Sequence, residues 1–227
     1  CFLTRMPKLS GVAAKYIPMK FYDCAKAPSP RRVRIFIDEK GVDVDTVQVD
    51  LAAGEQFGDA FRRLNPDGVV PVLELDDGNC LTEFMGICRY LEALVPEPPL
   101  FGSTALEQGL ITSWNVKVEQ HGLLGMAEAF RNSAPGFKGR ALTGPDSYEQ
   151  IPELAMRGRQ RVLGFLARLD KHLHDSEYLA GDKFSVADLT GLVFVDFARR
   201  ARISPESATT SLDRWYASVS SRPSASA

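Results

Sequence analysis

Residues 65–75 read Asn-Pro-Asp-Gly-Val-Val-Pro-Val-Leu-Glu-Leu, and this stretch decides the fold. Its first four residues are typical of a turn, because proline fixes φ and glycine allows a positive φ. The apolar run at 69–75 has the length and the β-branched residues of a buried strand. Pro71 lies inside this run and cannot donate a hydrogen bond to a neighbouring strand. We therefore expect it at a strand edge, a bulge or a functional site.

The segments around this stretch predict a mixed sheet covered by helices. Helical stretches between the first strands imply a parallel crossover, and the hairpin that follows residue 75 adds an antiparallel partner. The expected order is β-α-β-α-β-β-α. The expected strands are 19–23, 46–51, 69–75 and 79–82, and the expected helices are 31–40, 57–64 and 84–94.

The second half of the chain has a different character. Three of the four residues at 96–99 are proline, which predicts a stiff linker at 96–102. Beyond it the apolar residues follow a helical spacing, and no strand is expected. We expect residues 1–18 to be a leader or a disordered extension, 19–95 to be one domain and 103–227 to be a second. The expected helices of the second domain are 104–132, 148–175, 186–200 and 211–220.

Composition excludes several classes of protein. The 227 residues are 44% hydrophobic and carry a formal net charge of -2, so neither a nucleic-acid surface nor an anionic membrane partner is expected. No apolar run approaches the ~20 residues that span a bilayer. The four cysteines form no Cys-x-x-Cys pair and the chain has only three histidines, so we expect no metal site and reduced thiols in the cytoplasm.

Taken together, these motifs resemble the cytosolic glutathione transferases, most closely the bacterial type. Residues 65–75 resemble the cis-proline loop of the thioredoxin fold, residues 27–41 the first loop and helix of the family, and residues 179–188 the folding motif of its helical domain. In that last motif Ser185 and Asp188 also predict a capping box at the start of a helix. The resemblance covers the chain from Met19 almost to its end. It implies an α+β protein, with a thioredoxin-like βαβαββα domain followed by an all-α domain. It also implies glutathione as co-substrate, a cytoplasmic homodimer and a role in detoxification.

The thiolate of glutathione needs a hydrogen-bond donor between the first strand and the first helix. Ser29 is the first candidate, because its hydroxyl can donate and because it precedes a helix expected near Arg31, which it would cap. In the register of the family, Ser29 stands where some bacterial classes have Cys or Asn. Ala27 stands where other classes of the family have their catalytic Ser, Thr or Cys. Its methyl side chain cannot donate a hydrogen bond to the thiolate. Cys24 is the alternative, since its thiol could form a mixed disulfide.

The resemblance also places the residues that would bind glutathione. Val70, before a cis Pro71, would pair with the cysteinyl main chain, as an added strand does. Glu83 would bind the glutamyl ammonium, and Gln56 the glycyl end. Phe84 stands where the family usually has Ser, so only its N–H remains for the glutamyl carboxylate, and its ring could obstruct the pocket.

The electrophile site is expected to be lined by the first loop and by the long helix at 104–132. Its candidate lining residues are Trp114, Val118 and His121, with Met126 and Phe130 further along. Core packing or a dimer contact is the alternative for each of them.

Three functions follow from this reading. The first is a transferase that conjugates glutathione to a small hydrophobic electrophile. The second is a glutathione-dependent disulfide reductase. The third is a non-catalytic binding or interaction protein of the same fold, which Ala27 and Phe84 favour.

Overall fold

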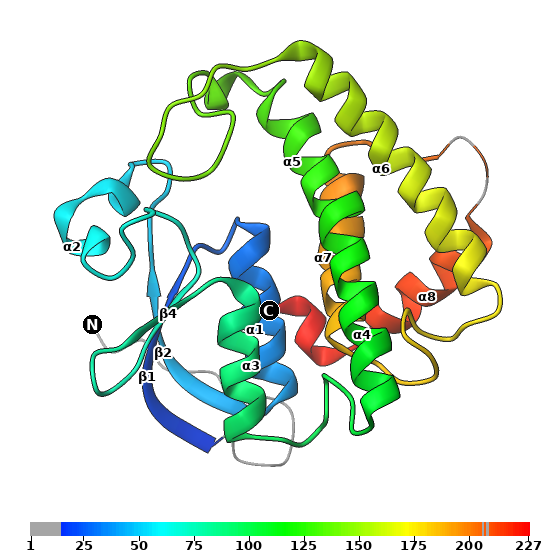
Figure 1. Cartoon of the computed structure of the whole chain (residues 1–227), viewed down its shortest axis with the longest axis horizontal. Helices are drawn as coiled ribbons and strands as arrows, with labels where there is room; N and C mark the ends of the chain where they lie inside the picture. The colour runs from blue at the N-terminus through cyan, green and yellow to red at the C-terminus, as the bar shows by residue number, and fades with distance from the viewer. Residues whose placement is uncertain (1–14, 206, 208) are drawn as a thin grey trace.

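A computed structural model describes residues 15–205, 207 and 209–227 (Figure 1). Its sheet has four strands in the order β2-β1-β3-β4. β1 runs parallel to β2, β3 runs antiparallel to β1, and β4 runs antiparallel to β3. The predicted mixed sheet is therefore confirmed. The strands are β1 (Lys15–Asp23), β2 (Val42–Gln48), β3 (Val72–Glu74) and β4 (Cys80–Thr82).

Helices complete this domain in the predicted order. α1 (Pro28–Glu39) joins β1 to β2, and its apolar residues Val33, Ile35 and Phe36 are fully buried. A 3-10 turn (Glu55–Phe57) and the short α2 (Asp59–Arg62) precede the loop at 65–71, and α3 (Phe84–Leu94) follows β4.

All four strands differ from the predicted ranges at one boundary or both. β1 begins at Lys15, so residues 15–18 belong to the sheet and not to the expected extension, while residues 1–14 lie outside the described residues. β2 ends at Gln48, whereas a strand was expected at 46–51. β3 begins only at Val72, because Pro71 cannot donate a hydrogen bond to the ladder. The Val70–Pro71 peptide bond is cis.

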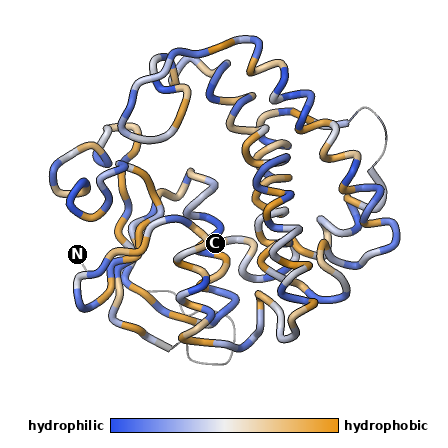
Figure 2. The backbone as a smooth tube through the Cα atoms, viewed as in Figure 1, coloured by the Kyte–Doolittle hydropathy of each residue, from blue (hydrophilic) through white to orange (hydrophobic). Residues whose placement is uncertain are grey.

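Helices alone form the second domain, as predicted. α4 continues through a π-helical segment (Val118–Leu123) into α5, and the chain closes with a 3-10 turn (Pro223–Ser226). Figure 2 shows hydrophilic and hydrophobic segments alternating along α6 at the edge of the molecule, as expected of a helix buried on one side. The helices are α4 (Ala105–Lys117), α5 (Leu124–Arg131), α6 (Pro152–Leu173), α7 (Val186–Arg200) and α8 (Thr210–Ser220).

The buried Asp188 organises the core of the helical domain. Ser185 caps α7, and the predicted capping box is confirmed. The Asp188 carboxylate accepts hydrogen bonds from Ser185, from the Leu179 N–H (2.8 Å) and from Trp215 Nε1 (2.9 Å). Although these donors favour the charged form, burial dominates and raises the pKa of Asp188 to about 6.

Two arginines of α1 join the domains. Arg31 Nη1 pairs with Asp196 of α7 at 2.6 Å, and Arg32 Nη1 pairs with Glu119 of the π-helical segment at 2.7 Å. These contacts hold the start of α1 against the helical domain. Within the described part of the chain, none of the helices has the length and hydropathy needed to cross a bilayer.

Candidate functional site

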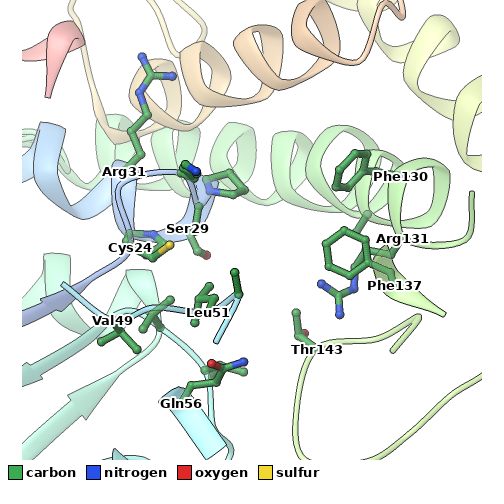
Figure 3. A pocket seen from close by; sticks show the side chains of 18 of the residues that line it. Cys24, Ser29, Arg31, Val49, Leu51, Gln56, Phe130, Arg131, Phe137 and Thr143 are labelled. Atoms are coloured by element: carbon green, nitrogen blue, oxygen red, sulfur yellow. The ribbon is translucent and has the colours of Figure 1, made fainter. Parts of the chain in front are cut away.

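A cavity of about 1110 Å³ opens between the two domains. The sheet domain lines it with residues 24–32 at the start of α1, with the segment after β2 and with the loop at 68–70. The helical domain lines it with α5, with the loop that follows α5 and with the end of α7. In Figure 3, Cys24, Ser29 and Gln56 face Phe130, Phe137 and Thr143 across the space.

Ser29 and Cys24 lie side by side on the wall of the cavity, as Figure 3 shows. Ser29 is not the helix cap that was expected. α1 begins at Pro28, three residues before the expected start at Arg31, and Ala27 holds the cap position without a side-chain hydrogen bond. The reason is that proline is favoured in the first turn of a helix, where its missing N–H costs nothing. The Ser29 side chain is therefore not engaged in capping, and the Cys24 thiol is free.

Arg32 positions the Ser29 hydroxyl. Its Nη2 donates to Ser29 Oγ at 2.9 Å, while its Nη1 is held by Glu119. The guanidinium lies 4.0 Å over the ring of Phe84. Burial lowers the pKa of Arg32, but the Glu119 carboxylate opposes this effect. Because Oγ already accepts a hydrogen bond from Arg32, the hydroxyl hydrogen of Ser29 is left to donate to a ligand in the cavity.

The Phe84 side chain lies away from the cavity. Its side chain is only 2% exposed, packs in the core beneath Arg32 and does not line the cavity. Glu83 precedes it with φ +63, a conformation that costs a non-glycine residue roughly 1–3 kcal/mol. Glu83 is exposed at the start of α3, and neither it nor the buried Pro71 lines the cavity.

Val70 and Gln56 do line the cavity. Within the described residues, the main chain of Val70 makes no hydrogen bond to other backbone groups, so its N–H and C=O remain for a ligand. Gln56 is 2% exposed, and its Oε1 has no partner among those residues. A buried amide oxygen without a partner is costly, and a ligand donor would satisfy it.

The three predicted electrophile residues lie elsewhere. Trp114 stacks on His172 with ring centroids 4.0 Å apart, Val118 is fully buried, and His121 packs against Phe165; none of them lines the cavity. The prediction placed these residues on one continuous helix at 104–132. In the structure a π-helical segment at 118–123 separates α4 from α5, and Trp114 and His121 pack against α6.

Three aromatic side chains of the helical domain line the cavity instead, and they form an aromatic wall: Phe130, Phe137 and Phe197. Phe130, one of the residues considered along the long helix, contacts Phe137 at 5.3 Å and Phe197 at 5.5 Å between centroids. Arg131 lies over Phe137 and donates to the carbonyl oxygens of residues 140, 141 and 142, which holds the loop in place. Sequence reasoning missed Phe137 and Phe197, because a loop has no periodicity and α7 reads as a core helix.

Comparison with known proteins agrees with this arrangement. Residues 28–94 match the family model "Glutathione S-transferase, N-terminal domain", and residues 134–223 match "Glutathione S-transferase, C-terminal domain". A relative from Saccharomyces cerevisiae, "Glutathione S-transferase 2", is 35% identical over 91% of this chain and 87% of its own. The chain belongs to the glutathione S-transferase family. The resemblance drawn from the sequence, the fold and the assignment as an enzyme of this family are thereby confirmed.

Two solved structures support the glutathione S-transferase fold over the same length. Gtt2 from Saccharomyces cerevisiae is 34% identical with a TM-score of 0.83, covering 91% of this chain and 98% of that structure. A glutathione S-transferase domain-containing protein from Marinobacter aquaeolei is also 34% identical with a TM-score of 0.83, covering 90% and 98%. The similarity therefore includes both walls of the cavity.

Proposed function

We propose that this glutathione S-transferase conjugates the thiolate of glutathione to a small apolar electrophile in the cavity between its domains. The observation that carries the proposal is the Ser29 hydroxyl, which Arg32 holds at the cavity wall with its proton free. A cysteine thiol with a pKa of ~8.5 is mostly protonated at neutral pH. A donor hydrogen bond and a nearby guanidinium both favour its thiolate.

The tripeptide fits the remaining groups of the site. Its cysteinyl main chain would pair with the free N–H and C=O of Val70, and its ammonium would meet the exposed Glu83 at the start of α3. The buried side-chain amide of Gln56 would form a hydrogen bond with the glycyl end of glutathione. The Phe84 N–H remains for the glutamyl carboxylate, since the first N–H groups of a helix have no partner within it.

The electrophile would lie against Phe130, Phe137 and Phe197. These rings face the Ser29 side of the cavity, so an aromatic or aliphatic electrophile bound to them would lie beside the thiolate. Binding that orders the two reactants in this way accelerates their reaction.

Calorimetric titration of glutathione into the purified protein tests the proposal first. Binding in the millimolar range or tighter, together with turnover of a chlorodinitrobenzene probe, is the expected result. A folded protein that neither binds glutathione nor turns over the probe would overturn it and favour the non-catalytic reading.

One observation favours a second activity, the reduction of disulfides by glutathione. The free Cys24 thiol lies on the cavity wall, where it could form a mixed disulfide with a substrate. Reduction of a glutathionylated peptide by the wild type but not by Cys24→Ala would assign this activity.

A cytoplasmic homodimer is the assembly that we propose. Leu106 is 72% exposed and Leu110, one helical turn later on α4, is 42% exposed. An apolar stripe of this kind is a candidate for contact with a second copy of the chain. The free thiols of Cys24, Cys80 and Cys88 support a reducing compartment.

A further inference from the structure

Two arginines flank the ring of Phe57, but only one of them faces the cavity. The guanidinium of Arg140 lies 5.0 Å from the ring centroid, and that of Arg62 lies 5.9 Å from it. Arg140 and Phe57 both line the cavity, whereas Arg62 does not. Arg140 belongs to the helical domain, and Figure 1 shows its loop arching from α5 toward α2 of the sheet domain.

The positive charge of Arg140 lacks a protein counter-ion. Within the described residues, no carboxylate lies within salt-bridge distance of Arg140 or of the neighbouring Arg131. Arg131 is already held by three carbonyl oxygens, and burial followed by the charge of Arg140 lowers the pKa of Arg131. By contrast, Arg31 and Arg32 of the same cavity are each paired with a carboxylate.

Two acidic residues near Phe57, Asp50 and Glu55, are engaged with the backbone. Asp50 Oδ1 accepts from the N–H groups of Ala52 and Ala53, and Glu55 Oε2 accepts from the Asp50 N–H. Arg140 is therefore free to take an anionic group of a ligand in the part of the cavity that Phe57 lines.

We propose that Arg140 binds the glycyl carboxylate of glutathione, so that the helical domain supplies the cation of the glutathione site. This inference rests on the proposed function. With the thiol at Ser29 and the cysteinyl main chain at Val70, the tripeptide would place one end at α3 and the other at Gln56 and Phe57. The glutamyl end carries its own ammonium, whereas the glycyl carboxylate has no internal counter-charge and needs a cation from the protein.

The test combines two ligands with two variants. Glutathione and its glycyl ethyl ester, which lacks this charge, are titrated into the wild type, Arg140→Ala and the matched control Arg62→Ala. A charge-assisted contact predicts that Arg140→Ala binds glutathione about tenfold to a hundredfold more weakly. The ester should bind equally to the wild type and to Arg140→Ala, and Arg62→Ala should behave as the wild type.

Each other outcome overturns the inference in a recognisable way. If the wild type binds glutathione and Arg140→Ala retains the wild-type preference for glutathione over its ester, Arg140 does not bind the glycyl carboxylate. If Arg140→Ala changes only the KM of an acidic electrophile, the arginine serves the second substrate. If the wild type binds no glutathione, the proposed function fails as well. If the alanine variant does not fold, the same two ligands are titrated into Arg140→Gln, which removes the charge but retains most of the side-chain length.

Discussion

Arg32 donates a hydrogen bond to Ser29 three residues earlier in α1, with 2.9 Å between Nη2 and Oγ. The same guanidinium is fixed by Glu119 of the helical domain, so the orientation of the Ser29 hydroxyl depends on how the two domains meet. This geometry makes Ser29 a donor toward the cavity and places a buried positive charge behind it.

Replacing Ser29 with Ala is expected to lower kcat/KM about tenfold to a hundredfold, because one hydrogen bond to a thiolate is lost. The free energy of unfolding should change by less than about 1 kcal/mol, because Ser29 does not cap α1. Steady-state kinetics with the chlorodinitrobenzene probe and chemical denaturation measure the two quantities. Cys24→Ala is the control and should retain conjugation. Wild-type turnover in Ser29→Ala would remove the role assigned to the hydroxyl.

Phe130→Ala is expected to raise the KM for an apolar electrophile about fivefold and to leave the KM for glutathione unchanged. The ring is 37% exposed and contacts both Phe137 and Phe197, so its removal takes apolar surface from one substrate only. Tyr148→Ala, which removes an exposed aromatic ring outside the cavity, is the matched control. An equal rise in both KM values would mean that the wall is structural and does not contact the electrophile.

The stability of the protein is expected to fall as the pH rises from about 4 to about 6. The folded pKa of Asp188, about 6, lies above its ordinary value of 3.8, so the folded state holds the proton more tightly than the unfolded chain does across this interval. Ionisation of this group therefore costs the folded state about 3 kcal/mol above pH 6, and the cost is absent below pH 4.

Denaturation of the wild type at a series of pH values measures how the free energy of unfolding depends on pH. The part of this dependence that comes from Asp188 should be absent from Asp188→Asn. The exposed Asp213→Asn should keep the wild-type profile. A difference between the wild type and Asp188→Asn that is independent of pH from 4 to 6 would show that the carboxylate stays ionised when buried.

Introducing charge at Leu106 and Leu110 is expected to convert a dimer into a monomer. Both side chains are exposed on one face of α4, so glutamate there should not disturb the fold, but it would place like charges inside an interface between copies. Sedimentation velocity of Leu106→Glu/Leu110→Glu measures the change. Met156→Glu, at a side chain of α6 that is 63% exposed, is the control. A wild type that sediments as a monomer would exclude the interface.

Local sequence was sufficient for the elements and their order. The turn at 65–68, the helical spacing after residue 102 and the capping box at Ser185 each depend on contacts within a few residues. The helices Phe84–Leu94 and Val186–Arg200 accordingly have the bounds that were predicted. Residues 24, 29, 56 and 70 were chosen from their positions in motifs, and all four line the cavity, while their roles toward glutathione stay predictions.

Only the tertiary structure decided which side chains the two domains bring together. Trp114 and His121 pack against α6 and Val118 is fully buried, so none of the three lines the cavity, and the residue types alone did not indicate this packing. Phe84 packs into the core beneath Arg32, while Phe137, Phe197 and Arg140 reach the cavity from distant parts of the chain. The spacing of residues along a chain specifies which face of an element each side chain occupies. It does not specify what that face meets, because that depends on how separate elements pack.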